Sequence, residues 1–98
     1  MTLRHVVAWK LAAADQETRD AHAQEISERL RALVGVVHSI GSLTVGPNVI
    51  DGNWDVALVA DFEDAEALDA YQTHPIHQEV VAYVRSVVSD RVAVDFEL

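Results

Sequence analysis

The chain has 98 residues, half of them apolar, and 7 basic side chains against 16 acidic ones give it a net charge of −9. This length and composition fit one domain over residues 1–98. A chain this acidic has no basic stripe with which to bind nucleic acid or an anionic membrane. No apolar run is long enough to span a membrane, the first ten residues lack a signal-peptide pattern, and there is no cysteine. We therefore expect a cytoplasmic protein.

The first half of the chain is expected to form a strand, a helix and a weaker strand. Residues 3–11 alternate with period two, which predicts a strand. Residues 15–34 carry apolar side chains at helical spacing, with Asp15 as the N-cap and Gly35 as the stop. Residues 39–46 indicate a weaker strand, and the turn-forming residues that follow predict a loop.

The second half is expected to form a strand, a helix interrupted by a proline, and a final strand. Residues 54–62 alternate most clearly. Asp64 caps a short helix, and Pro75 begins another that reaches about Val88, because proline suits the first turn of a helix. Residues 91–98 form the last strand.

The order of these elements predicts the fold class. A β-α-β-β-α-β order is typical of the ferredoxin-like α+β fold, with a four-stranded antiparallel sheet in the order 4-1-3-2 and helices on one face. The first and third strands are then central, and both carry apolar residues on both faces. One layer of helices covers only one face, so we expect a second copy to cover the other, sheet against sheet.

His77 is the residue that points most clearly to chemistry. It shares an apolar helical stripe with Val81, Val84 and Val88, which is expected to face the sheet. Desolvation among valines would lower the pKa of the imidazole and suit it to act as a general base. The alternative is a core histidine that a backbone carbonyl satisfies.

Three further polar residues have two interpretations each. The Tyr71 hydroxyl is expected to bond His77, a water or a substrate oxygen, or else Tyr71 is a core residue. His5 lies on an apolar strand face, either in a cavity or at a capped edge. Asp55 either orients a histidine or substrate hydroxyl, or lies in solvent at a strand end.

The sequence predicts no metal or cofactor. His74 and His77 have the i, i+3 spacing of a metal-chelating pair, but no third ligand is identifiable, and His74 also suits a helix N-cap or a solvent position. There is no phosphate-binding glycine loop, nucleophile elbow or HExxH motif.

Three segments also carry a family resemblance. They are RHVVAWK at 4–10, WDVALVADF at 54–62, and ALDAY followed by HPIH within 67–77. Together they resemble the stress-responsive dimeric α/β-barrel (Dabb) family over essentially the whole chain, and the Y-x-x-H-P-x-H segment is the specific part. The resemblance implies a ferredoxin-like protomer, a homodimer whose two sheets pack into a barrel, and a cavity between sheet and helices.

Most members of that family have no assigned reaction, but a plant branch closes linear polyketides into aromatic rings by an aldol-type step. His5, Tyr71 and His77 match three site positions of that branch, and Asp55 stands where it has a further histidine. His77 is therefore expected to be the base, Tyr71 to orient it or bond the carbonyl oxygen, and His5 to assist. The expected substrate contacts are Asp55, Val7, Trp9, Val59 and Val81.

These expectations leave three functional hypotheses. The first is a cofactor-free cyclase, isomerase or lyase that acts on a carbonyl-bearing or aromatic metabolite. The second is a non-catalytic small-molecule-binding or structural dimer. The third is a cofactor-free monooxygenase like those of related barrel families, which nothing but a shared fold supports.

Overall fold

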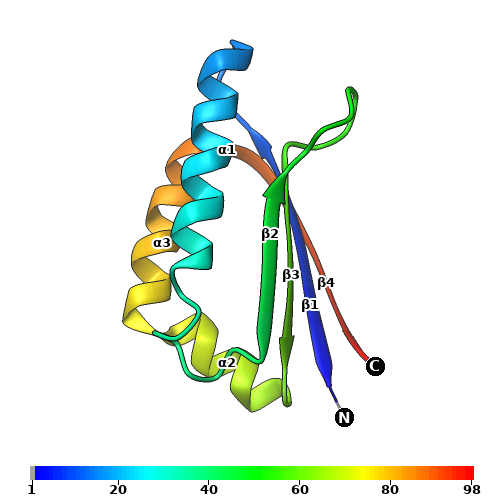
Figure 1. Ribbon diagram of the computed structural model, residues 1–98, viewed down its shortest axis with the longest axis vertical. Helices are drawn as coiled ribbons and strands as arrows, with labels where there is room; N and C mark the ends of the chain where they lie inside the picture. Colours follow the sequence, from blue (N-terminus) through cyan, green and yellow to red (C-terminus); the bar gives the residue numbers. More distant parts are fainter. Residues whose placement is uncertain (1) are drawn as a thin grey trace.

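The computed structural model describes residues 2–98, which form one antiparallel sheet and a layer of helices (Figure 1). The elements are β1 (Leu3–Leu11), α1 (Gln16–Arg31), β2 (Ser42–Pro47), β3 (Val56–Phe62), α2 (Ala65–Thr73), α3 (Pro75–Val87) and β4 (Val88–Glu97). The strand order is β2-β3-β1-β4. The structure thus confirms the predicted ferredoxin-like fold class and the predicted sheet order.

All three helices lie on one face of the sheet (Figure 1). Alternate residues of the two central strands are buried there. On β1 they include His5, Val7 and Trp9, and on β3 they are Val56, Leu58, Ala60 and Phe62. The helix-facing side of each strand, which alternation alone left undetermined, is therefore the His5 side of β1 and the Phe62 side of β3.

The helices begin where the sequence predicts. The Asp15 carboxylate accepts a hydrogen bond from the Thr18 N–H, and the Asp64 carboxylate accepts one from the Ala67 N–H, each at 2.9 Å. Both are N-caps that satisfy otherwise unpaired amides of a first helical turn.

Helix α1 ends at Arg31, three residues earlier than predicted. Beyond it, the chain tightens into i to i−3 hydrogen bonds, with the Leu33 N–H donating to the Leu30 carbonyl at 3.1 Å and the Val34 N–H to the Arg31 carbonyl at 3.2 Å. Gly35, the predicted stop, lies in the turn beyond this end with a φ of 86°, a conformation that favours glycine, and the helix already ends before it.

The other strands differ from the prediction at their ends. β2, β3 and β4 cover residues 42–47, 56–62 and 88–97 rather than 39–46, 54–62 and 91–98. β3 starts later because Asp55 belongs to a turn, in which its N–H donates to the Trp9 carbonyl at 2.9 Å and its carboxylate accepts from the Leu11 N–H at 2.7 Å. β4 starts earlier because Val88 already pairs with Leu11.

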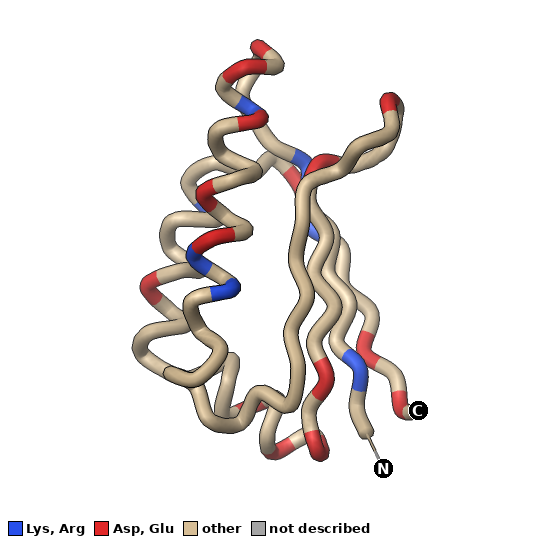
Figure 2. The backbone as a smooth tube through the Cα atoms, viewed as in Figure 1, with Lys and Arg blue, Asp and Glu red and all other residues tan. Residues whose placement is uncertain are grey.

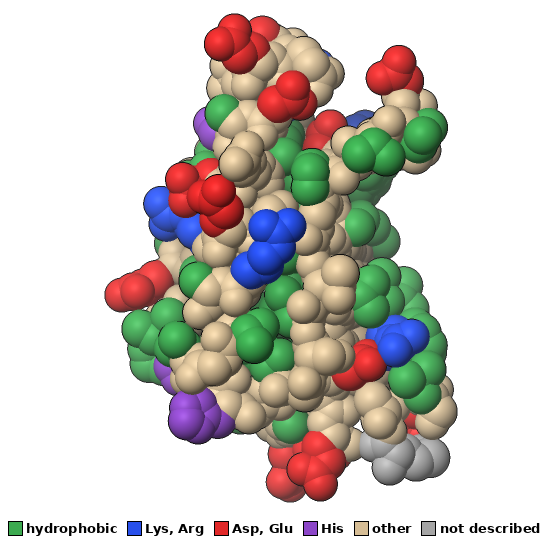
Figure 3. Space-filling view, in the orientation of Figure 1, with side chains coloured by type: hydrophobic (Ala, Val, Ile, Leu, Met, Phe, Trp, Pro, Cys, Tyr) green, Lys and Arg blue, Asp and Glu red, His purple; other side chains and the backbone are tan. Residues whose placement is uncertain are grey.

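The sheet face opposite the helices carries an uncovered apolar surface, which we call the outer sheet patch. Its residues are Val6, Ala8, Ala57, Val59, Val92, Val94 and Phe96, which the strand register places opposite one another on one face. Val94 is 58% exposed. Hydrophobic side chains are visible along this side of the sheet, to the right in Figure 3.

Charged residues lie away from the interior. Acidic residues lie along α1 and at both ends of the sheet (Figure 2). Within residues 2–98, the helices are too short or too polar to cross a membrane.

Candidate functional site

A cavity of about 490 Å³ lies between the sheet and helix α3. His5 from β1, Tyr71 from α2 and His77 from α3 all line it, together with the predicted contacts Val7, Trp9 and Val81. Its lining also includes residues that are exposed at the surface, among them Gln78, Arg85 and Arg91. The cavity therefore extends from a buried histidine to the surface of the protomer.

The break between α2 and α3 brings the two site aromatics of this segment together. In one uninterrupted helix, residues six apart would be rotated by roughly 240° about its axis and would not meet. Pro75 starts a new helix instead, and the rings of Tyr71 and His77 lie with their centroids 4.0 Å apart and tilted by 38°. The His5 ring is 6.4 Å from the Tyr71 ring in an edge-on arrangement.

The hydrogen bonding of His77 determines which of its nitrogens is basic. Nδ1 lies 3.3 Å from the Gln72 carbonyl oxygen, which only accepts, so Nδ1 carries the hydrogen and Nε2 is the free acceptor. Burial lowers the pKa of His77, the Gln72 carbonyl partly offsets this, and repulsion from His5, Arg91 and His74 lowers it further. The imidazole is therefore neutral near pH 7, as a general base must be.

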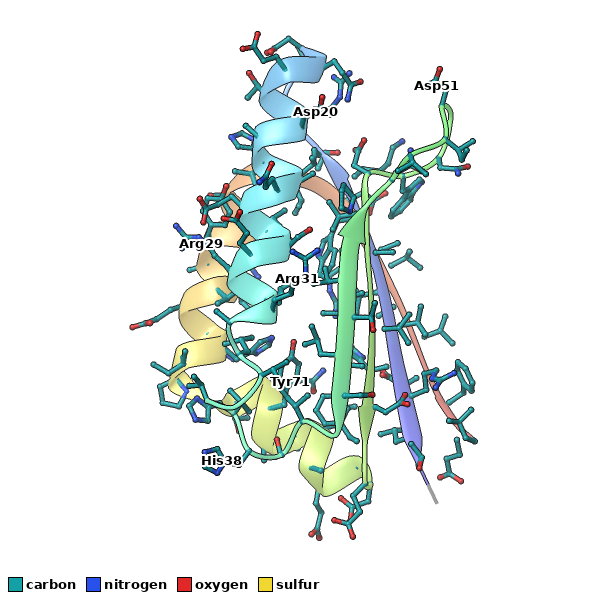
Figure 4. All side chains as sticks on the ribbon, viewed as in Figure 1. Asp20, Arg29, Arg31, His38, Asp51 and Tyr71 are labelled. Carbon is teal, nitrogen blue, oxygen red and sulfur yellow. The ribbon has the colours of Figure 1, made fainter. Side chains whose placement is uncertain are left out.

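Tyr71 offers a hydrogen-bond donor, whereas His77 offers an acceptor. Its side chain is only 2% exposed and lies between the helices and the sheet (Figure 4). Burial raises the pKa of Tyr71 to about 12, with a small opposing effect of the Arg91 charge. The phenol thus stays protonated, and within residues 2–98 no other group forms a hydrogen bond with its hydroxyl.

His5 is held by a residue that sequence reasoning missed. Its ring is 4% exposed, and Nδ1 lies 2.5 Å from a carboxylate oxygen of Asp95, its directly opposite neighbour on β4. Because the carboxylate accepts, Nδ1 is the donor, and the ring orientation is fixed. Alternation in the last strand did place Asp95 and Arg91 on one face, but only the pairing of β1 with β4 shows that this is the face of His5.

Two predicted substrate contacts lie outside the cavity, which corrects their assignment. Val59 is 37% exposed on the outer sheet patch, on the far side of β3. Asp55 is in the turn before β3, where its carboxylate accepts from the Leu11 N–H. Alternation from residue 54 to 62 had put both on one strand face, and that face is turned away from the helices.

The histidines at 74 and 77 each have a partner for Nδ1 within the protein. His74 caps α3, with Nδ1 accepting from the Ile76 N–H at 3.1 Å, and His77 Nδ1 is directed to Gln72. Across residues 2–98, no group of three or more His, Asp or Glu side chains is placed to hold a metal ion.

Solved structures share this fold over nearly their whole length. A dimeric ferredoxin-like protein of unknown function from Bacteroides fragilis has a TM-score of 0.92 and 26% identity, covering 99% of this chain and 96% of that one. A second such protein, from Thermobifida fusca, has a TM-score of 0.84 and 27% identity, covering 100% and 92%. A hydroxynitrile lyase from Passiflora edulis has a TM-score of 0.79 at 11% identity, covering 97% and 91%.

Family membership rests on the sequence itself. No curated protein matches the chain. The family model described as the stress responsive A/B barrel domain matches residues 3–98. This span includes every strand and helix described above, so the chain belongs to the stress-responsive A/B barrel (Dabb) domain family.

Proposed function

We propose that this protein is a homodimer in which each protomer binds a small carbonyl-bearing or aromatic metabolite and moves a proton on it without a cofactor. The reaction class is a cyclase, isomerase or lyase. The observation that carries the proposal is the pair formed by His77 and Tyr71. A neutral imidazole with a free acceptor and a protonated phenol lie 4.0 Å apart, by ring centroids, in the lining of one cavity.

This pair suits enolisation of a carbonyl compound. His77 Nε2 accepts a proton from the carbon next to the carbonyl, the C–H electron pair forms the enolate double bond, and the carbonyl π electrons move to oxygen. Tyr71 donates a hydrogen bond to that oxygen as its negative charge develops. The proton then returns from His77 to another carbon of the substrate, or the enolate attacks a second carbonyl and His77 protonates the new alkoxide.

His5 supports this arrangement from the opposite wall. Asp95 fixes its Nδ1 as a donor, so Nε2 is the nitrogen left to bind a ligand hydroxyl or water. His5 therefore assists by orienting the substrate, while His77 and Tyr71 act at the reacting atoms.

The outer sheet patch supports the homodimer. An apolar face that runs across the sheet is an unfavourable surface to leave in water. The proteins from Bacteroides fragilis and Thermobifida fusca, which share the fold at 26% and 27% identity, are described as dimeric. We place the partner's sheet against this patch, so that the cavities lie on the outer sides of the two sheets.

One observation favours the alternative of a non-catalytic binding or structural dimer. His77 already has a backbone partner, the Gln72 carbonyl, as a purely structural histidine would. The two interpretations differ in what Nε2 does, which an experiment can measure.

The test is exchange of the α-protons of phenylacetone in D₂O, followed by proton NMR. This probe combines an aromatic ring with a carbonyl, and exchange reports proton removal before any further step. We expect the wild-type protein to accelerate exchange, and His77→Gln to lower the rate by about 100-fold. The matched control is His38→Gln, because His38 is exposed and points away from the sheet (Figure 4). Equal rates for wild type and His77→Gln would contradict the catalytic role.

A further inference from the structure

We propose that the natural ligand is an organic anion, with an apolar body and a carboxylate group that pairs with Arg91. This inference rests on the proposed function, because it concerns the ligand of the same cavity. It adds a specificity residue to the groups that handle the proton.

The strand register places Arg91 on the cavity side of the sheet. Its Cα lies opposite that of Trp9 in the pairing of β4 with β1, and directly opposed residues of antiparallel strands share a face. Arg91 and Trp9 both line the cavity. Since β4 is an edge strand, Arg91 is also exposed, so the guanidinium is accessible to an incoming ligand.

The guanidinium is free to pair with a ligand. Within residues 2–98, it takes part in neither an ion pair nor a side-chain hydrogen bond. The neighbouring carboxylate of Asp90 accepts from the backbone N–H of Arg91 at 2.9 Å rather than from its side chain. Arg85, from α3, is a second cation in the same lining, in which Asp90 is the one acidic residue from the part of the chain that the structure describes.

The charge of Arg91 reaches the catalytic pair. Burial raises the pKa of Tyr71 and lowers that of His77, and the Arg91 charge has a smaller lowering effect on both. In a chain of net charge −9, an unpaired cation beside a buried acid–base pair selects for a negatively charged ligand. The planar fork of arginine fits a carboxylate in particular, with two parallel N–H donors.

The apolar residues of the lining indicate the chemistry of the rest of the ligand. Val7, Val81 and Val84 line the cavity along with the polar residues. They contribute no hydrogen-bonding side chain, so a hydrocarbon or aromatic body is the chemistry that matches them. The expected ligand thus has a carboxylate at Arg91, an apolar body along the valines, and a carbonyl at Tyr71 and His77.

The experiment compares two probes of nearly equal shape, 3-phenylpropanoate and 3-phenylpropanamide, by NMR titration of the full chain. We expect the carboxylate to bind wild-type protein about tenfold more tightly than the amide. Arg91→Gln should remove this preference by weakening the binding of the carboxylate about tenfold more than that of the amide. Lys10→Gln, which makes the same change of charge at an exposed residue outside the cavity, should retain the preference.

The possible failures are distinguishable. If both probes bind equally, or if Arg91→Gln keeps the preference, the anion inference is overturned while binding of small molecules in the cavity stands. If neither probe shifts the resonances of Tyr71 and His77 up to its solubility limit, both the inference and the proposed binding function are overturned.

Discussion

Replacing Val94 by aspartate should separate the proposed homodimer into folded protomers. Val94 lies in the outer sheet patch opposite Val6 and is 58% exposed in the protomer. Fully burying a valine is worth about 1.5–3 kcal/mol, so covering the exposed part is worth about 1 kcal/mol per copy. A two-fold interface buries Val94 of both copies, so losing both contributions costs about 2 kcal/mol of binding free energy. This corresponds to dimerisation with a roughly thirtyfold weaker Kd. Desolvation of the new carboxylate adds several kcal/mol per copy.

Sedimentation velocity over a range of protomer concentrations measures the effect, and circular dichroism verifies the fold. The matched control is Val49→Asp, which changes the charge equally at a valine that is 88% exposed on the β2–β3 connection. We expect the control to dimerise like wild type and Val94→Asp to sediment as a monomer. An unchanged dimerisation constant for Val94→Asp would refute the assignment of the outer sheet patch as the interface.

Three further predictions concern the site and its scaffold. Because burial lowers the pKa of His77, phenylacetone exchange should be constant near neutral pH and fall about tenfold per pH unit below that pKa, which lies under 6.5; a midpoint above 6.5 would contradict this. Gly41→Ala should lower the free energy of unfolding by about 1–3 kcal/mol, measured by urea titration, because the new Cβ would lie 2.9 Å from the Asp61 carbonyl oxygen. Asp55→Ala should lower the free energy of unfolding by about 1 kcal/mol, because the hydrogen bond from the Leu11 N–H is lost, and should leave ligand affinity in the cavity unchanged. A large change in ligand affinity would indicate that Asp55 contacts the ligand after all.

The lowered pKa of His77 also has a consequence for stability. The unfolded chain takes up a proton on this histidine more readily than the folded chain does, so the folded state is favoured above the unfolded pKa of about 6.5. This contribution of His77 to the free energy of unfolding is lost as the pH falls from the unfolded pKa through the pKa of His77 in the folded chain. His77→Gln removes this term, so its unfolding free energy should depend less steeply on pH below about 6.5 than that of wild type.

The fold could be predicted because its signals are local. Asp15 and Asp64 mark helix starts through contacts that span three residues, and the strands alternate along their own length. The break at Pro75 was equally visible, and it is this break that lets Tyr71 meet His77. Pattern and resemblance were therefore enough to propose the candidate residues on this segment and on the first strand.

What the sequence could not supply depends on pairing between distant segments. Asp95 reaches His5, and Arg91 lines the cavity, only because β4 returns beside β1 in one particular register. Asp55 and Val59 were misplaced because both faces of the third strand carry apolar residues, so alternation could not determine which face the helices cover. The position of Asp55 in a turn, bonded to Leu11, also depends on a contact across the sheet.

The proposed chemistry requires His77 to present a neutral imidazole with an unprotonated Nε2 to the cavity, beside the protonated hydroxyl of Tyr71. Long-range proton–nitrogen NMR correlations of the histidine rings, followed through a pH titration, test it without any substrate. We expect neutral His77 to carry its hydrogen on Nδ1 and to titrate below 6.5. A hydrogen on Nε2 would leave no acceptor nitrogen of His77 facing the cavity, and a pKa above 6.5 would contradict the lowering of the pKa by burial; either result would contradict the proposed chemistry.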